Sequence, residues 1–399
     1  MSSLFVFLLC LIPFGWGRGL LDSNTSNTFN VVSYGAVGDG NTDDSQAFLK
    51  AWDAMCKAKF STAIFQIPTS KTFLLKPVSF QGPCNSPSIE VSVLGNMVAS
   101  DMSAWNKDKS IWIQFTDIHG LTIDGQGQVD GRGNAWWQCA SKDGDNCPRP
   151  PALSIHGCNN LELNGLNVIN SPRNHISING CEGAKISNIH ITSPEDSPNT
   201  DGINISDSTH VEVHDSSIAS GDDCIAINNG CSFVNITNVG CGPGHGISIG
   251  SLGQNGDHNT VEEIHVKVCN FTRTMNGVRI KTWPGGSGYA RKISFEQITL
   301  KDVNNPIIID QYYCGGNSGS CQNHTSNVDI SGITYNGLHG TSSNPAAINL
   351  NCSKSVPCTD ISMNDINITP EKSGEKIYST CINARGTSSD TSPAVPCLG

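Results

Sequence analysis

The sequence predicts an all-β fold, a parallel β-helix covered at its N-terminal end by one helix. Three copies of one pattern support this prediction: Asp201-Gly-Ile-Asn-Ile, Asp223-Cys-Ile-Ala-Ile and His245-Gly-Ile-Ser-Ile begin 22 residues apart. Coils of about this length, with short strands and tight turns, are typical of a solenoid. The alternative is a β-sandwich whose strands are evenly spaced by coincidence. The solenoid is preferred because it explains the equal spacing.

Residues 1–19 are expected to be a secretory signal peptide, although the cleavage site is uncertain. The apolar run from Leu4 to Phe14 is too short to span a bilayer, and the small residues Gly15 and Gly17 follow it. Residues 28–399 show no composition break that would mark a linker. We therefore expect them to form a single domain, released as a soluble, extracellular protein.

The cysteine content fits an oxidising compartment. Of 17 cysteines, Cys10 lies in the predicted signal peptide, which leaves an even number for the mature chain. Three pairs close in sequence are plausible bridges, namely Cys224/Cys241, Cys352/Cys358 and Cys381/Cys397. Four others lie in strand-like stretches and could equally be free, namely Cys158, Cys181, Cys231 and Cys269. Seven N-x-S/T sequons suit a secreted glycoprotein.

The predicted capping helix follows the turn that ends at Gly40. Thr42 is a good N-cap, with Asp43 and Asp44 in the first turn. Apolar residues then recur at helical spacing from Ala47 to Cys56. Because the open end of a solenoid needs covering, this helix is expected to close the first coil. No comparable helix is expected elsewhere.

From about Ser110 onward, short runs of alternating Ile, Val and Leu are separated by polar turns. Period-2 alternation predicts strands with two aliphatic side chains inside each coil. Neighbouring strands lie about 4.8 Å apart. The equal spacing therefore places Asp201, Asp223 and His245 directly above one another on one outer face.

These acids carry the candidate chemistry. Asp222 adds a third carboxyl group beside Asp223. A Gly-Asp-Asp turn alone is a weak signal, but three acids and the imidazole of His245 brought together by the repeat are harder to dismiss. Close carboxyl groups push their pKa values apart, so that one can serve as acid and another as base. Glycoside hydrolysis needs such a pair of carboxyl groups with different roles.

A pair of cations lies one coil further on. In Val278-Arg279-Ile280-Lys281 the aliphatic residues face inward, so Arg279 and Lys281 project from the face that bears the acids. Such a pair is usually only a solvated surface. Here the formal net charge of −11 argues against a nucleic-acid partner, while a local cationic pair could hold the carboxylate of an acidic sugar.

Two other enzyme classes fit poorly. Gly246-Ile-Ser248-Ile-Gly250 matches the nucleophile elbow of esterases, but that motif needs a strand-turn-helix context. Ser248 is instead expected in mid-strand, in the same column as Asn204 and Ala226. An aspartic protease is disfavoured because no Asp-Thr-Gly or Asp-Ser-Gly pair occurs.

Four motifs resemble those of the glycoside hydrolase family 28 polygalacturonases. They are Asn199-Thr-Asp201, Gly221-Asp-Asp223, Gly244-His-Gly246 and Arg279-Ile-Lys281, in this order and spacing. The similarity covers nearly the whole mature chain, and its length looks most like that of plant pollen exopolygalacturonases. The resemblance implies a right-handed, single-stranded, pectin-lyase-like β-helix.

The resemblance also implies catalytic roles. Asp222 would be the general acid that protonates the glycosidic oxygen, and Asp201 and Asp223 would activate the attacking water. His245 would help to set the protonation of Asp222. The family inverts the anomeric configuration, although stacked Asp201 and Asp223 would approach the short carboxyl separation of about 5–5.5 Å that is typical of retaining enzymes.

The substrate-binding roles follow in the same way. Arg279 and Lys281 would hold a galacturonate carboxylate, Tyr313 would contact the sugar, and Asn199 would line the cleft. Tyr312 is adjacent, so the tyrosine assignment could be off by one residue.

The implied activity is inverting hydrolysis of the α-1,4-galacturonosidic bonds of pectin homogalacturonan, with exo action. Endo action, rhamnogalacturonan hydrolysis and a catalytically inactive pectin-binding wall protein are the alternatives. His245 within Gly-His-Gly argues against rhamnogalacturonan hydrolysis. The intact acids argue against an inactive wall protein. No cofactor, metal, nucleic-acid or membrane partner is expected, and the protein is expected to be a monomer secreted to the cell wall.

Overall fold

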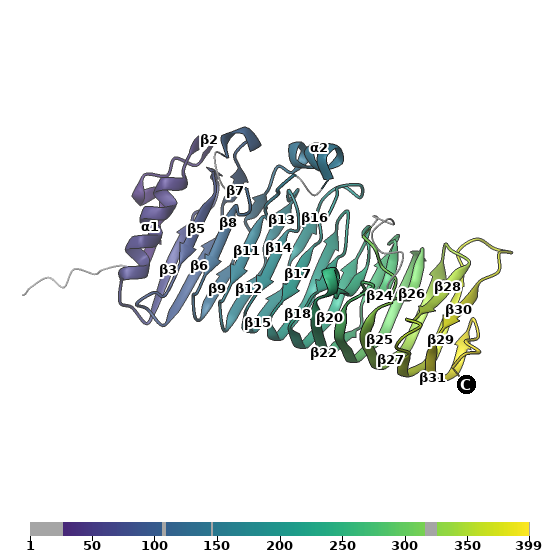
Figure 1. Ribbon diagram of the computed structural model, residues 1–399. Coiled ribbons are helices and arrows are strands. Elements are labelled where there is room, and N and C mark those ends of the chain that lie inside the picture. The colour runs from purple at the N-terminus through teal and green to yellow at the C-terminus, as the bar shows by residue number, and fades with distance from the viewer. Residues whose placement is uncertain (1–26, 106–108, 145–146, 316–324, 399) are drawn as a thin grey trace, which may run out of the picture.

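A computed structural model describes residues 27–105, 109–144, 147–315 and 325–398. The predicted signal segment 1–19 lies outside the described residues. Parallel strands are stacked side by side along an elongated body that runs from the N-terminal helix to the C-terminus (Figure 1). The fold is almost entirely β, and the prediction of a parallel β-helix is confirmed.

One sheet contributes one strand to each of eleven successive coils. In spatial order its strands are β5 (Val78–Gln81), β8 (Ile113–Thr116), β11 (Leu153–His156), β14 (Ile176–Asn179), β17 (Ile203–Ser206), β19 (Ile225–Ile227), β21 (Ile247–Leu252), β24 (Asn276–Thr282), β26 (Asn305–Asp310), β28 (Ala346–Asn351) and β30 (Tyr378–Ile382).

The second sheet bends around the remaining faces, because a long strand such as Thr209–Ala219 pairs with two shorter strands of the preceding coil. Its strands are β1 (Thr28–Asn30), β2 (Asp39–Asp43), β3 (Thr62–Ile67), β4 (Thr72–Leu75), β6 (Ser88–Val93), β7 (Asn96–Ala99), β9 (Leu121–Asp124), β10 (Gln128–Asp130), β12 (Leu161–Asn164), β13 (Asn167–Ile169), β15 (Glu182–Ser187), β16 (His190–Thr192), β18 (Thr209–Ala219), β20 (Cys231–Cys241), β22 (His258–Lys267), β23 (Asn270–Thr272), β25 (Ser287–Val303), β27 (Asn327–Ser342), β29 (Cys358–Pro370) and β31 (Ala384–Ser392).

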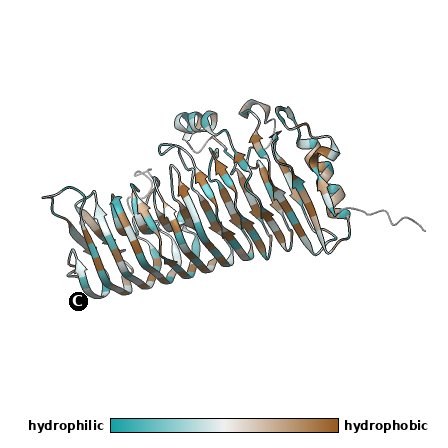
Figure 2. Ribbon diagram, turned by 180° about the vertical axis from the view of Figure 1, so that it is seen from behind, coloured by the Kyte–Doolittle hydropathy of each residue, from teal (hydrophilic) through white to brown (hydrophobic). Residues whose placement is uncertain are grey.

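The repeat register is as the sequence predicts. Ile203 pairs with Ile225, and Ile225 with Ile247, in parallel ladders. All three side chains are fully buried. Apolar and polar residues alternate along the strands (Figure 2), so each coil fills the interior with aliphatic side chains. The residues two positions before these isoleucines therefore come into register on adjacent coils.

The capping helix α1 (Ser45–Lys57) covers the N-terminal end of the solenoid (Figure 1). Its buried Phe48 and Trp52 pack edge-on against Phe65 of the first coil. The predicted N-cap was wrong. Thr42 lies in β2 and donates to Asp39, whereas Asp44 precedes the helix and accepts the amides of the turn at residues 37 and 38.

A second helix, α2 (Asn134–Asp143), contradicts the expectation that no further helix of note would occur. It is inserted between β10 and β11, where it buries Trp136 and Ala140. The Trp136 ring packs edge-on against Trp105. A disulfide joins Cys139 of this helix to Cys147. Among the described residues there are also short 3₁₀ helices, namely η1 (Val31–Tyr34), η2 (Met102–Ala104) and η4 (Gln254–Gly256).

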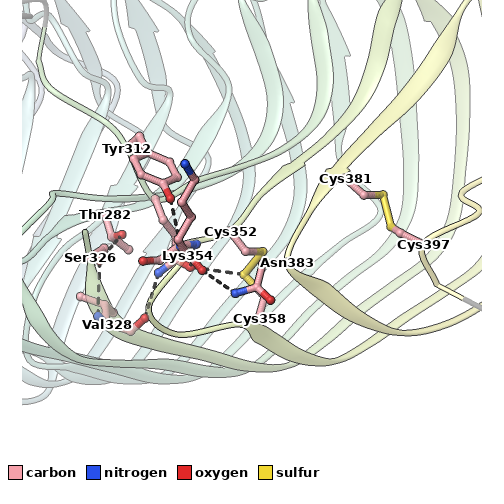
Figure 3. The surroundings of a disulfide bond; sticks show 12 residues. Thr282, Tyr312, Ser326, Val328, Cys352, Lys354, Cys358, Cys381, Asn383 and Cys397 are labelled. Atoms are coloured by element: carbon pink, nitrogen blue, oxygen red, sulfur yellow. Dashed lines mark hydrogen bonds between the residues drawn. A yellow bond between two sulfur atoms is a disulfide. The ribbon is translucent and has the colours of Figure 1, made fainter. Parts of the chain in front are cut away.

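The three predicted disulfides are confirmed, and the last two lie near the C-terminal coils (Figure 3). Cys56–Cys84 ties α1 to the turn after β5. The four cysteines left open by the sequence are free and buried: Cys158, Cys181, Cys231 and Cys269. Each thiol hydrogen-bonds the carbonyl two residues earlier, so these side chains serve as core residues. Within the described residues, no helix is long and apolar enough to cross a membrane.

Candidate active site

The predicted acids converge at the start of three neighbouring strands. Asp201 precedes β17, Asp222 and Asp223 precede β19, and His245 precedes β21. Backbone hydrogen bonds join these turns, from the Gly202 amide to the Asp223 carbonyl (2.9 Å) and from the His245 amide to the Asp222 carbonyl (2.7 Å). The regular coil spacing therefore determines how the four side chains meet.

Asp223 is buried and already paired. Its Oδ1 accepts from Nη2 of Arg279 at 2.7 Å, and its Oδ2 accepts from Nζ of Lys281 at 2.8 Å. Asp223 is 1% exposed, and the two cations are 9% and 7% exposed. The sequence suggested that the cations project freely from the sheet. In the structure they do not. A carboxylate this deeply buried needs charged partners, and these residues supply them from the second coil along.

Ser248 completes this buried network, and sequence reasoning missed its contribution. Its hydroxyl donates to Oδ1 of Asp223 at 2.7 Å and accepts from Nε of Arg279 at 2.9 Å. The side chain is fully buried, in register with Ala226 and Arg279. The sequence signal for this contribution was the position of Ser248 in the repeat, in the same column as Asn204 and Ala226. In the sequence, that position served only as an argument against a nucleophilic serine.

Asp222 contacts His245. Nδ1 of the imidazole lies 3.0 Å from Oδ1 of Asp222, and the Asp223 amide donates to the same oxygen at 2.8 Å. Burial acts to raise the pKa of Asp222, but the hydrogen bond and charge of His245 outweigh it and hold this pKa below its ordinary value. Asp222 is therefore ionised when His245 carries its proton.

Asp201 responds in the opposite direction. Burial raises the pKa of this carboxyl group well above its ordinary value, and the negative charges of Asp222 and Asp223 raise it further. The charge of Lys281 offsets only part of this effect. The cluster therefore separates the proton affinities of neighbouring acids, as the sequence predicted, with the pKa of Asp201 raised and that of Asp222 lowered.

Asn199 lies at the edge of the acid cluster. Its Nδ2 is 3.4 Å from Oδ2 of Asp222, and its backbone adopts the left-handed conformation that asparagine tolerates. Arg149, which the sequence did not single out, holds it in place. This buried guanidinium donates to Oδ1 of Asn199 at 2.7 Å and to the Pro198 carbonyl at 2.6 Å.

Tyr313, rather than Tyr312, faces the cations. Nζ of Lys281 lies 5.1 Å from the centre of the Tyr313 ring, and the guanidinium carbon of Arg279 lies 5.9 Å from it. The hydroxyl of Tyr312 instead accepts the backbone amide of Lys354, near the Cys352–Cys358 disulfide (Figure 3).

A second histidine lies beneath the acids. His175 is fully buried, and its Nδ1 lies 2.9 Å from the carbonyl oxygen of Asp201. Burial lowers the pKa of His175 to about 4, so the ring is neutral at ordinary pH and donates to that carbonyl. The sequence signal for this residue is Asn174-His-Ile-Ser-Ile, which resembles the three repeat copies and pairs with the first of them through Ile176 and Ile203.

The donor set at the centre resembles a metal site only superficially. Asp222, Asp223 and His245 offer ligand atoms within 4.8 Å of one another. Both oxygens of Asp223 are, however, bonded to cations. Charge balance from Arg279 and Lys281 leaves little electrostatic need for a metal ion, and the absence of a metal stays a prediction.

Comparisons with known proteins identify the family. The chain matches glycosyl hydrolases family 28 over residues 56–391. It belongs to this family and is a glycoside hydrolase. Among its relatives, a probable polygalacturonase of Arabidopsis thaliana is 48% identical over 94% of this chain and 81% of the relative. Polygalacturonase-2 of Solanum lycopersicum is 40% identical over 91% of this chain and 79% of the relative.

Solved structures agree on the architecture. The endo-xylogalacturonan hydrolase of Aspergillus tubingensis superposes with a TM-score of 0.79 at 24% identity, covering 90% of this chain and 96% of the other. The polygalacturonase of Erwinia carotovora superposes with a TM-score of 0.67 at 21% identity, covering 86% of this chain and 94% of the other. At these identities the likeness shows the fold, which is the right-handed parallel β-helix that the resemblance implied.

Proposed function

We propose that this protein is a polygalacturonase that hydrolyses the α-1,4-galacturonosidic bonds of pectin homogalacturonan. The observation that carries the proposal is that the acid cluster and the cationic pair are in direct contact. Asp223 links the two groups, because it is adjacent to Asp222 and bonded to Arg279 and Lys281. A substrate with a carboxylate on every sugar suits such a site.

In the proposed reaction Asp222 is the general acid. It must hold a proton when the bond breaks, although His245 keeps it ionised in the free protein. His245 can pass its proton to Asp222 across their 3.0 Å hydrogen bond. Asp222 then transfers this proton to the glycosidic oxygen as the bond to the anomeric carbon breaks.

The same proton transfer prepares the base. The charge of Asp222 helps to raise the pKa of Asp201, so neutralising Asp222 lowers that pKa and allows a proton on Asp201 to pass to solvent water. Ionised Asp201 can then accept a proton from the attacking water, whose oxygen bonds to the anomeric carbon. A carboxylate has about four acceptor positions, and the described residues use three of those on Asp223. The remaining position can orient the water.

The cations keep donors for the substrate. Arg279 uses Nε and Nη2 within the buried network, and Lys281 uses one N–H. Their other N–H groups are available to a galacturonate carboxylate, with the ring of Tyr313 beside them. Asp223 therefore positions the two cations, and this does not prevent them from binding substrate.

Inversion and exo action are finer parts of this proposal and rest on the family resemblance. We also propose that residues 1–19 direct secretion to the cell wall and that residues 28–399 act as one monomeric catalytic domain. The plant polygalacturonase relatives support an extracellular location.

The test is digestion of polygalacturonate by the wild type and by Asp222→Asn. The wild type should release reducing ends, and Asp222→Asn should lose at least about 1000-fold in turnover while keeping its melting temperature within a few degrees. Monomer as the first and only product would support exo action, whereas mixed oligomers would establish endo action. Near-normal turnover of the variant would refute the role of Asp222 as the general acid.

A further inference from the structure

His175 is the exception in a column of small residues that directly precede the strands of the eleven-stranded sheet. The strand registers align it with Gly202, Cys224 and Gly246 on the next three coils. In place of a small side chain, His175 carries an imidazole that is fully buried beside the backbone of Asp201. The proposed reaction does not use this ring, so its burial calls for another explanation.

The carbonyl oxygen of Asp201 accepts two hydrogen bonds from His175. One comes from the backbone amide at 2.8 Å and belongs to the regular parallel ladder, and the second comes from ring Nδ1 at 2.9 Å. The corresponding carbonyl of Asp223 accepts only the Gly202 amide from the described residues. Two donors hold the Asp201 peptide more firmly than the ladder bond alone, because both bonds have to break before this peptide can rotate.

The carboxyl group of Asp201 is not held by partners of its own. Among the described residues, no other residue forms a hydrogen bond or a close ion pair with it. The neighbouring acids differ, because Asp222 contacts His245 and the Asp223 amide, while Asp223 is held by Ser248 and two cations. The position of the Asp201 carboxyl group is therefore set mainly by its own peptide.

The residue before Asp201 is fixed by a second buried group. The Thr200 hydroxyl is fully buried, accepts the Gly221 amide at 2.9 Å and forms a hydrogen bond with the Ser197 hydroxyl at 2.6 Å. Gly221 packs so closely here that an added Cβ atom would overlap the Ser197 carbonyl oxygen. The turn that carries Asp201 is thus attached to the turn that carries the neighbouring acids, and His175 holds it from the preceding coil.

His175 acts through Nδ1 and adds no charge. Burial lowers the pKa of His175 to about 4, although the backbone groups of Asp201, Thr192 and Thr200 favour its protonation. The other ring nitrogen, Nε2, forms no regular hydrogen bond with the described residues. A neutral donor suits this place, because a positive charge beside Asp201 would lower the pKa of that acid and make it a weaker base.

We propose that His175 is a positioning residue for the base of the reaction. Its Nδ1–H group fixes the carbonyl of Asp201, and this peptide in turn fixes where the Asp201 carboxyl group meets the attacking water. The inference rests on the proposed function, in which Asp201 accepts a proton from that water. Arg279 and Lys281 lie on β24, three coils beyond β17, so loss of the Nδ1 donor should impair turnover rather than substrate binding. Misplacing a catalytic group by about 1 Å can cost about 100-fold in rate.

The test compares two matched variants of the full mature protein, His175→Asn and His175→Gln. Asparagine places its amide nitrogen near the position of Nδ1, whereas glutamine places it near that of Nε2, so only asparagine can donate to the Asp201 carbonyl. Both changes replace a buried neutral imidazole with a neutral amide, and the two melting temperatures should agree within a few degrees. On polygalacturonate, kcat should fall about 30-fold in His175→Gln and no more than about threefold in His175→Asn, with KM within about twofold of the wild type in both.

A double-mutant cycle shows whether His175 acts through Asp201. In an Asp201→Asn background the base is already missing, so adding His175→Gln should lower the residual kcat by less than about threefold. The measurement uses enzyme concentrations high enough to follow this residual turnover. A further loss of about 30-fold would mean that the substitution acts on Asp222 or on substrate binding instead, and would overturn the inference.

The tautomer of His175 gives a measurement that does not depend on activity. Nitrogen NMR of the wild-type protein with isotopically labelled histidine should show one neutral ring, absent from His175→Asn, that carries its proton on Nδ1. A proton on Nε2 would overturn the inference, and so would equal losses of kcat in the two variants of an active enzyme. A wild type that released no reducing ends from polygalacturonate would instead refute the proposed function, and the inference with it.

Discussion

Nη2 of Arg279 lies 2.7 Å from Oδ1 of Asp223, and this ion pair is almost completely buried. Lys281 binds the other oxygen of the same carboxylate at 2.8 Å. One carboxylate therefore pairs with both cations that the sequence assigns to the substrate, and it balances one of their two positive charges.

Asp223→Asn should destabilise the protein. The amide keeps the shape but leaves two buried cations without their counter-charge, which is expected to lower the free energy of unfolding by about 3 kcal/mol. Chemical denaturation at neutral pH measures this change. A variant as stable as the wild type would show that the cations are balanced by other groups.

Asp201→Asn should have the opposite effect at neutral pH. A carboxyl group whose folded-state pKa is raised stabilises the fold at low pH, and this contribution is lost as the pH rises through that pKa. Removing the charge should therefore raise the melting temperature on the order of 2 °C at pH 7 and have little effect near pH 4. Asp257→Asn, at an exposed acid elsewhere, is the control. A gain that does not grow with pH would contradict the raised pKa.

Ser248→Ala should impair activity without unfolding the protein, because Ala226 occupies the same column one coil earlier. Loss of the hydroxyl removes one donor to Asp223 and the acceptor for Arg279, so kcat/KM on galacturonan should fall about tenfold. If Ser248 positions Arg279, the loss should appear mainly in KM.

The matched control for Ser248 is Ser177→Ala. Ser177 lies in the same column on an earlier coil and forms no side-chain hydrogen bond with the described residues. Equal losses in the two variants, or none in either, would exclude a positioning role for Ser248.

His245→Gln should separate proton supply from geometry. Glutamine can still donate a hydrogen bond to Asp222 but carries no charge, so the pKa of Asp222 should rise. Asp222 must then take its proton from solvent, and kcat should fall about 100-fold, with the residual activity confined to more acidic pH. The pH–rate profile measures this. A profile of unchanged shape would mean that His245 does not supply the proton.

Much of this architecture could be predicted because a solenoid converts sequence spacing directly into spatial position. Asp201, Asp223 and His245 could be placed together from a constant repeat, and Ile203, Ile225 and Ile247 pair as that repeat requires. The one-residue offset of Asp222 also corresponds to a different environment, since Asp222 contacts His245 while its neighbour Asp223 contacts the cations.

The remainder depends on how deeply side chains lie, which spacing does not encode. The sequence placed Arg279 and Lys281 on the face that bears the acids, but their pairing with Asp223 follows from burial, because an unpaired carboxylate is unfavourable there. The helix α2 interrupts the repeat and has no counterpart in the described parts of the other coils, so periodicity could not reveal it. The choice between Tyr312 and Tyr313 likewise depends on the conformation of a turn.

The most direct test of the proposed mechanism is proton NMR of trigalacturonate during the first minutes of digestion by the purified wild-type protein. Water activated by Asp201 on the face opposite Asp222 predicts that the newly formed reducing end appears first as the β-anomer and then equilibrates. An initial α-anomer would contradict inversion, and an unsaturated sugar product would contradict hydrolysis itself.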